Sequence, residues 1–74
     1  MDKATAFVMA TEYRCRSIGY SRTRVTFWMF LDDFRTQKGL DRMFLKVRQL
    51  LWDIGFRNLL IKGNDYGYEI EATV

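Results

Sequence analysis

The residues with the clearest chemical potential are four arginines between positions 14 and 24, a stretch that no acidic residue interrupts. They are Arg14, Arg16, Arg22 and Arg24. A guanidinium group presents a planar fork of N–H donors that fits a phosphate or a carboxylate through two parallel hydrogen bonds. The cluster therefore predicts a surface that binds an anionic partner, either an acidic protein surface or a nucleic acid.

The arginines are placed symmetrically about Gly19. In a hairpin that turns at Gly19, Arg14 opposes Arg24 and Arg16 opposes Arg22. Side chains alternate between the two faces of a strand, so all four share one face. The other face then carries three apolar pairs: Phe7 with Leu31, Met9 with Met29, and Tyr13 with Val25.

Two aromatic residues, Trp28 and Phe30, have the same parity as the arginines, and Tyr20 lies near the predicted tip. Val8 and Ala10 lie across the predicted ladder from Trp28 and Phe30. One half of this face is thus apolar and the other half basic, a combination that is typical of interaction surfaces and their hot spots. The candidate partner-binding residues are Arg14, Arg16, Tyr20, Arg22, Arg24, Trp28 and Phe30.

Four interpretations of the apolar half remain open. It could be the face of a weak homodimer, a docking face for another protein, or a platform on which nucleic-acid bases stack. The fourth reading is that residues 32–39 fold back and cover it.

No set of residues in the sequence points to catalysis. The chain has no histidine, which is the usual acid or base near neutral pH and a common metal ligand. Asp32 and Asp33 are adjacent and point opposite ways in an extended chain, while Glu69 and Glu71 suit pairing with Lys or Arg. Cys15 reads as a small buried hydrophobe. We therefore expect no enzyme, no catalytic residue, no metal ion and no cofactor.

The elements that position these residues begin with two strands, over residues 4–16 and 22–31, joined by a loop over residues 17–21. From Leu40 to Ile54 the apolar residues follow a helical period. Gly55 suits the C-terminal end of this helix, and Thr36 or Asp41 suits its start.

A second predicted hairpin joins a strand over residues 56–62 to one over residues 68–74, with a turn at Asn64 and Asp65. It pairs Leu59 with Ile70 and Ile61 with Tyr68. The order β-β-α-β-β predicts an α+β fold of two layers, a four-stranded and mostly antiparallel sheet with one helix packed on one face. We expect residues 1–74 to form a single domain.

The composition of the chain indicates which cellular compartment to expect. A single cysteine excludes a disulfide within the monomer and fits a reducing compartment. No signal-peptide pattern is visible, and no run approaches the ~20 apolar residues of a membrane span. We expect a cytoplasmic protein without a membrane partner.

The favoured function is a small non-enzymatic protein-binding module or inhibitor. Size and composition of this kind are common among accessory proteins of phages and mobile elements. We therefore expect a target such as a host nucleic-acid-handling or defence complex, in the manner of an anti-CRISPR protein. The alternative is direct DNA or RNA binding through the same face, although a net charge of +3 is modest for that role.

Overall fold

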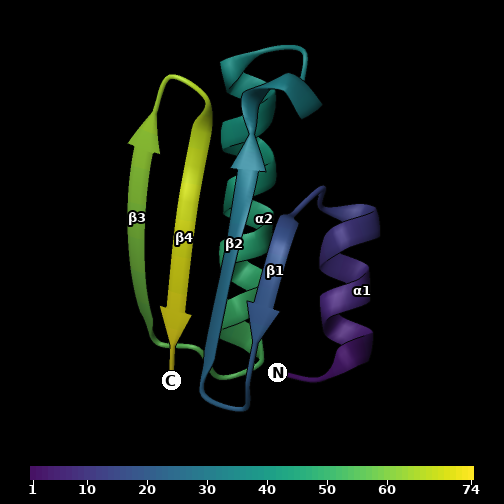
Figure 1. Ribbon diagram of the computed structural model, residues 1–74, viewed down its shortest axis with the longest axis vertical. Coiled ribbons are helices and arrows are strands. Elements are labelled where there is room, and N and C mark those ends of the chain that lie inside the picture. The colour runs from purple at the N-terminus through teal and green to yellow at the C-terminus, as the bar shows by residue number, and fades with distance from the viewer.

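The computed structural model describes residues 1–74 and has the element order α-β-β-α-β-β (Figure 1). Helix α1 spans Lys3–Glu12, and the first hairpin is formed by β1, Arg16–Tyr20, and β2, Arg24–Phe30. A short 3-10 helix, η1, at Leu31–Asp33 leads to α2 at Gln37–Asp53. The second hairpin consists of β3, Asn58–Asn64, and β4, Gly67–Thr73.

The four strands form one sheet in the order β1-β2-β4-β3, and every neighbouring pair is antiparallel. Helix α2 lies across one face of the sheet, and α1 lies beside β1, which is an edge strand (Figure 1). The predicted α+β class and the four-stranded antiparallel sheet are confirmed. The predicted element order is incomplete, because a further helix precedes the first hairpin.

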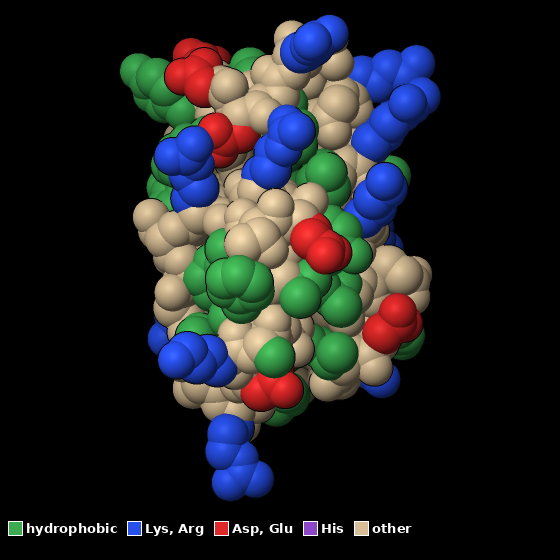
Figure 2. Space-filling model, turned by 90° about the vertical axis from the view of Figure 1, so that its right-hand side faces the viewer, with side chains coloured by type: hydrophobic (Ala, Val, Ile, Leu, Met, Phe, Trp, Pro, Cys, Tyr) green, Lys and Arg blue, Asp and Glu red, His purple; other side chains and the backbone are tan.

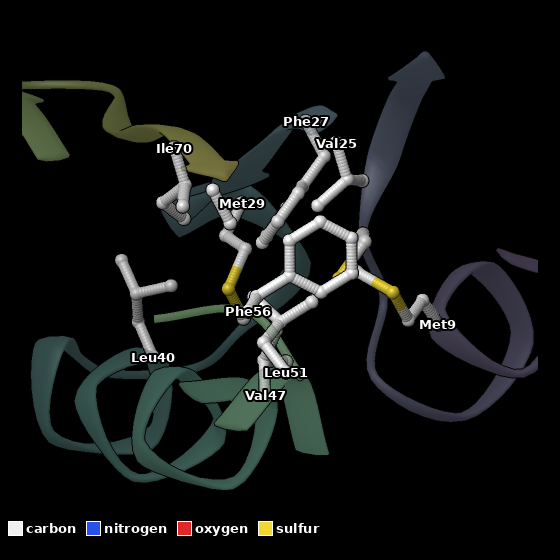
Figure 3. Packing of buried hydrophobic residues seen from close by; sticks show 11 residues of the cluster. Met9, Val25, Phe27, Met29, Leu40, Val47, Leu51, Phe56 and Ile70 are labelled. Atoms are coloured by element: carbon white, nitrogen blue, oxygen red, sulfur yellow. The ribbon is translucent and has the colours of Figure 1, made fainter. Parts of the chain in front are cut away.

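The core lies between the sheet and the two helices (Figure 3). Alternate residues of β2 are buried, namely Val25, Phe27 and Met29, because β2 is a central strand with one face against α2. Leu51 of α2 and Met9 of α1 reach the same cluster. Each large side chain buried in this way contributes roughly 1.5–3 kcal/mol, so the two helices are held mainly by apolar contacts.

The prediction of a strand over residues 4–16 is wrong, because most of this segment forms α1. Asp2 caps the helix by accepting a hydrogen bond from the Thr5 amide at 2.8 Å. A strand would put Phe7 and Met9 on one face, whereas in a helix they point in different directions. Accordingly, Met9 is fully buried and Phe7 is exposed.

The predicted register of the first hairpin is also wrong. Gly19 lies inside β1 and opposes Thr26, while Arg16 opposes Trp28 rather than Arg22. The chain turns further on, after Tyr20. The register shifts between Arg16 and Gly19, where Ser17 has a left-handed backbone with φ of 55°.

The second half of the chain follows the prediction more closely. Helix α2 begins three residues earlier than predicted, with Thr36 accepting a hydrogen bond from the Gly39 amide at 3.0 Å, and Gly55 follows its end with φ of +109°. The register of the second hairpin differs by two residues, since Leu59 opposes Ala72 and Ile61 opposes Ile70. A shift of two keeps each side chain on its predicted face. Neither helix is both long and apolar enough to cross a membrane.

Candidate partner-binding face

The sheet face that points away from α2, here called the open face, holds the candidate site. Figure 1 views the molecule from this side. On β2 the open-face residues alternate with the buried ones. They are Arg24, Thr26, Trp28 and Phe30. From the ladder pairs, β1 adds Arg16, and β4 adds Glu69 and Glu71.

Trp28 and Phe30 form an aromatic stack on this face, near the C-terminal end of β2. Their ring centroids are 5.2 Å apart and their planes differ by 4°. Both side chains are half-buried. Gly67, which opposes Phe30 on β4, adds no side chain beside that ring. The pair therefore presents a partly exposed apolar surface on the open side of the sheet.

An ion pair lies on the open face near the start of β2. Nη2 of Arg24 lies 3.1 Å from Oε2 of Glu71, and both side chains are more than a third exposed. Arg22 lies in the loop between β1 and β2, is exposed, and forms no ion pair. The arginine on the strand is thus neutralised within the molecule, whereas the one in the loop is not.

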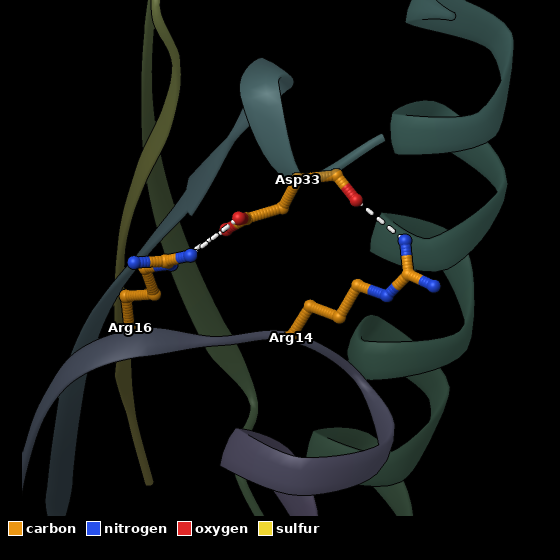
Figure 4. Close-up of polar contacts among 3 residues, drawn as sticks. All are labelled: Arg14, Arg16 and Asp33. Carbon is orange, nitrogen blue, oxygen red and sulfur yellow. Dashed lines mark hydrogen bonds and ion pairs between the residues drawn. The ribbon is translucent and has the colours of Figure 1, made fainter. Parts of the chain in front are cut away.

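Asp33 accepts hydrogen bonds from the other two arginines of the cluster (Figure 4). Arg16 donates from Nε to Oδ2 at 2.6 Å and from Nη2 to Oδ1, and this contact raises the pKa of Arg16. Arg14 donates from Nη1 to the backbone carbonyl of Asp33, and its guanidinium lies 5.3 Å from the Phe34 ring centroid. Three arginines of the cluster therefore hold the fold together locally.

The predicted site residues are brought together only in part. Trp28 and Phe30 lie on the open face as predicted, together with Arg16 and Arg24. Arg14 precedes β1 with a left-handed backbone at φ of 58°, and Tyr20 lies at the exposed end of β1 with the parity of buried Val25.

The predicted apolar partners of Trp28 do not join it. Val8 and Ala10 belong to α1 and are absent from the open-face ladder. Residues 32–39 form the end of η1, a connection and the start of α2, and Trp28 and Phe30 remain half-exposed. The patch is therefore smaller than predicted and is built on β2 alone.

Charges of both signs are mixed over the surface. Figure 2 shows the α1 side, where Asp and Glu side chains lie among the Lys and Arg side chains. On the open face Glu69 lies opposite Trp28 and also opposite Lys62 of β3. Acidic side chains therefore lie among the basic ones on both of these sides.

The remaining reactive groups are placed in structural roles. Burial raises the pKa of the Cys15 thiol to about 12, so this group is a neutral thiol at physiological pH. The Asp33 and Glu71 carboxylates are paired with arginines. No group of three or more His, Cys, Asp or Glu side chains is placed to hold a metal ion.

Sequence reasoning missed a groove between α2 and β3. Its volume is about 730 Å³. Its lining residues are Leu45, Arg48, Gln49, Trp52, Arg57, Leu59 and Ile61. A signal was present, because Leu45 and Trp52 lie outside the apolar stripe of the helix and are seven positions apart, which places them on one side.

Comparison with protein-family models, with curated proteins and with solved structures gives no match for this chain.

Proposed function

We propose that this chain is a non-enzymatic protein-binding module whose contact surface is the open face. The observation that carries the proposal is the Trp28–Phe30 stack on a sheet face that no helix covers. Large aromatic side chains dominate binding energy when a partner buries them, and a pre-formed stack loses little conformational entropy on binding.

The charges around the stack favour a protein partner over a nucleic acid. Arg16 and Arg24 are already paired with carboxylates, and Glu69 adds a further negative charge beside Trp28. Phosphates that approached this face would meet these acids, whereas a protein rim can offer both signs of charge. Arg22, which has no carboxylate partner, is the group best placed to meet an acid on the partner.

Such a module acts by occupying a surface of its partner. It inhibits a complex when the occupied surface is one that the complex needs for assembly or for substrate entry. Buried aromatic contacts then set the dissociation rate, and the arginines guide the approach. This combination suits an inhibitor of a larger complex.

Affinity capture tests the proposal with wild type, Trp28→Ala and a matched control, Phe7→Ala. Phe7 is 68% exposed on α1 and lies away from the open face, so its loss should not change partner recovery. We expect Trp28→Ala to lower the recovery of a specific protein at least about tenfold. Equal recovery by all three proteins would contradict the proposal.

A binding titration with single- and double-stranded DNA and RNA separates the nucleic-acid alternative. Direct binding would give a log affinity that falls linearly with log salt, in proportion to the phosphates contacted. We expect no binding at physiological salt. Tight, salt-dependent binding that Arg22→Gln and Trp28→Ala both weaken would replace the protein partner by a nucleic acid.

A further inference from the structure

Strand β3 is an edge strand with an unpaired outer side. It pairs only with β4, so the N–H and C=O groups of alternate residues point away from the sheet. The chain has no proline, no β3 residue has a left-handed backbone, and Lys62 is the only charged residue in the strand. The other edge, β1, lies beside α1 and is interrupted by an irregular register. The β3 edge is therefore the one that is open to a further strand.

Apolar side chains lie next to this edge. Ile61 of β3 is 42% exposed, and Leu45 and Trp52 of α2 are 56% and 53% exposed. All three line the groove between α2 and β3. A strand that paired with β3 would extend the sheet and bring its own helix-side residues to the mouth of this groove.

Arg57 is held in position just before β3. Its Nη1 donates to the Trp52 carbonyl at 2.6 Å, and its guanidinium lies 4.1 Å from the Trp52 ring centroid. No carboxylate of the chain pairs with it. The groove thus ends in an oriented, exposed cation whose charge is not neutralised.

We propose that this edge is a two-fold interface at which β3 pairs antiparallel with β3 of a second copy, centred on Ile61. A two-fold contact brings each residue against its mirror position along the strand. Asp65, just after β3, is the mirror position of Arg57, so each end of the seam joins a cation to a carboxylate. Lys62 meets Leu60, and like charges do not face each other.

This mirror arrangement favours a second copy of the chain over a foreign strand. The only charged residues that line the groove are two cations, Arg48 and Arg57. The complementary carboxylate, Asp65, is supplied by the same chain at the required distance along β3. Like-charge pairs across a ladder destabilise it and opposite charges stabilise it. The resulting sheet has eight strands, and the open faces of both copies lie on the same side of it. The β3 interface leaves these faces uncovered, so this inference does not depend on the proposed function.

Disulfide trapping tests the register directly. Residues at the two-fold centre have Cα atoms within the range of about 4.4–6.8 Å that a disulfide spans. The only native cysteine, Cys15, is buried and does not interfere. We expect Ile61→Cys to form a covalent dimer under mild oxidation.

Asn58→Cys is the matched control on the same exposed strand. Antiparallel pairing about Ile61 separates the two copies of position 58 by about 20 Å, so we expect no cross-link. Cross-linking of both variants, or of Asn58→Cys alone, would overturn the proposed register.

A charge reversal supplies an independent readout by sedimentation velocity. Asp65→Lys places two cations opposite one another at each end of the seam, and we expect the dimer dissociation constant to rise about tenfold or more. The Asp65 side chain makes no hydrogen bond or ion pair in the monomer, so the melting of the fold itself should hardly change. Adding Arg57→Glu to this variant should restore the dimer.

The outcomes separate clearly. A concentration-dependent dimer that Asp65→Lys weakens and the double variant restores supports the proposal. A wild-type monomer at high micromolar concentration overturns it and leaves the β3 edge to a foreign strand. A dimer that Asp65→Lys leaves unchanged also overturns it, because association then uses another surface.

Discussion

The guanidinium of Arg16 and the carboxylate of Asp33 form a two-pronged ion pair, with Nε of Arg16 2.6 Å from Oδ2 of Asp33. Arg16 begins β1 and Asp33 ends η1, which directly follows β2. The pair therefore ties the start of the first hairpin to the chain that leaves it. In the sequence, the forked guanidinium of Arg16 suggests a residue that binds an anionic partner. In the structure it binds a carboxylate of the same chain instead.

The first prediction concerns this pair. Asp33→Asn should lower the free energy of unfolding only slightly, because the Arg16 side chain is largely exposed and water screens the interaction. Urea unfolding of Asp33→Asn, Arg16→Gln and the double variant measures the coupling between the two side chains. The coupling should shrink in high salt, and purely additive effects would show that the pair contributes nothing.

The second prediction concerns Gly67, where β4 passes β2 too closely for a side chain. A Cβ atom there would stand 2.1 Å from the carbonyl oxygen of Met29, and the backbone has φ of +142°. Gly67→Ala should therefore destabilise the protein by about 3 kcal/mol or more, since backbone atoms must move.

Two glycines serve as controls for Gly67. Gly55 has φ of +109° but open space around it, so Gly55→Ala should cost only about 1 kcal/mol. At Gly39, within α2, the added Cβ would make ordinary contacts, so Gly39→Ala should stabilise by roughly 0.5–1 kcal/mol. Thermal melting of the three variants gives the order, and a Gly67→Ala protein as stable as Gly39→Ala would contradict it.

The parts of the fold that the sequence predicts are those with local signals. The helical period from Leu40 to Ile54 identifies α2, with Thr36 and Gly55 near its ends, and the alternation of β2 places Trp28 and Phe30 on the open face. These patterns depend on neighbouring residues, and so they remain visible in a single chain.

The errors arise where local patterns are ambiguous or where distant segments decide. In α1, the alternate spacing of Phe7 and Met9 fits a strand, and only the Asp2 cap and the alanines favour the helix. The mirrored arginines suggest a turn at Gly19, but the Arg16–Asp33 pair depends on where η1 folds. The groove depends on the approach of α2 to β3, and the positions of Leu45 and Trp52 on the helix do not indicate which strand lies beside them.

The third prediction is a pH dependence that arises from a contact between α2 and β4. Hydrogen bonds donated by Tyr68 and then by Gln37 lower the pKa of Asp41 below its ordinary 3.8. The same bond to Asp41 raises the pKa of Tyr68 above its ordinary 10.0.

The two pKa shifts change the stability of the fold at opposite ends of the pH range. A lowered carboxyl pKa stabilises the fold above pH 3.8, and this stability is lost as the pH falls further through the folded-state pKa. A raised tyrosine pKa stabilises the fold below pH 10.0, and this stability is lost as the pH rises through the folded-state pKa. Urea unfolding across the pH range should show wild type and Tyr68→Phe converging at both extremes. A constant difference at every pH would show that the hydrogen bond does not couple to titration.

The fourth prediction concerns the reactivity of Cys15. Its thiol is 3% exposed, and burial raises its pKa to about 12. At mildly alkaline pH the thiolate fraction should be about a thousandfold lower than that of an exposed cysteine. Iodoacetamide should therefore modify the native protein very slowly, and denaturant should remove the protection.

The Asn58→Cys variant carries an internal control for this experiment. Its introduced thiol lies on exposed β3, so mass spectrometry should find one label added quickly and the second only after unfolding. The Cys15 amide donates to the Met9 carbonyl at 3.0 Å, and Met9 packs in the same apolar cluster. Rapid labelling of both thiols in the native state would therefore mean that α1 detaches from the sheet without global unfolding.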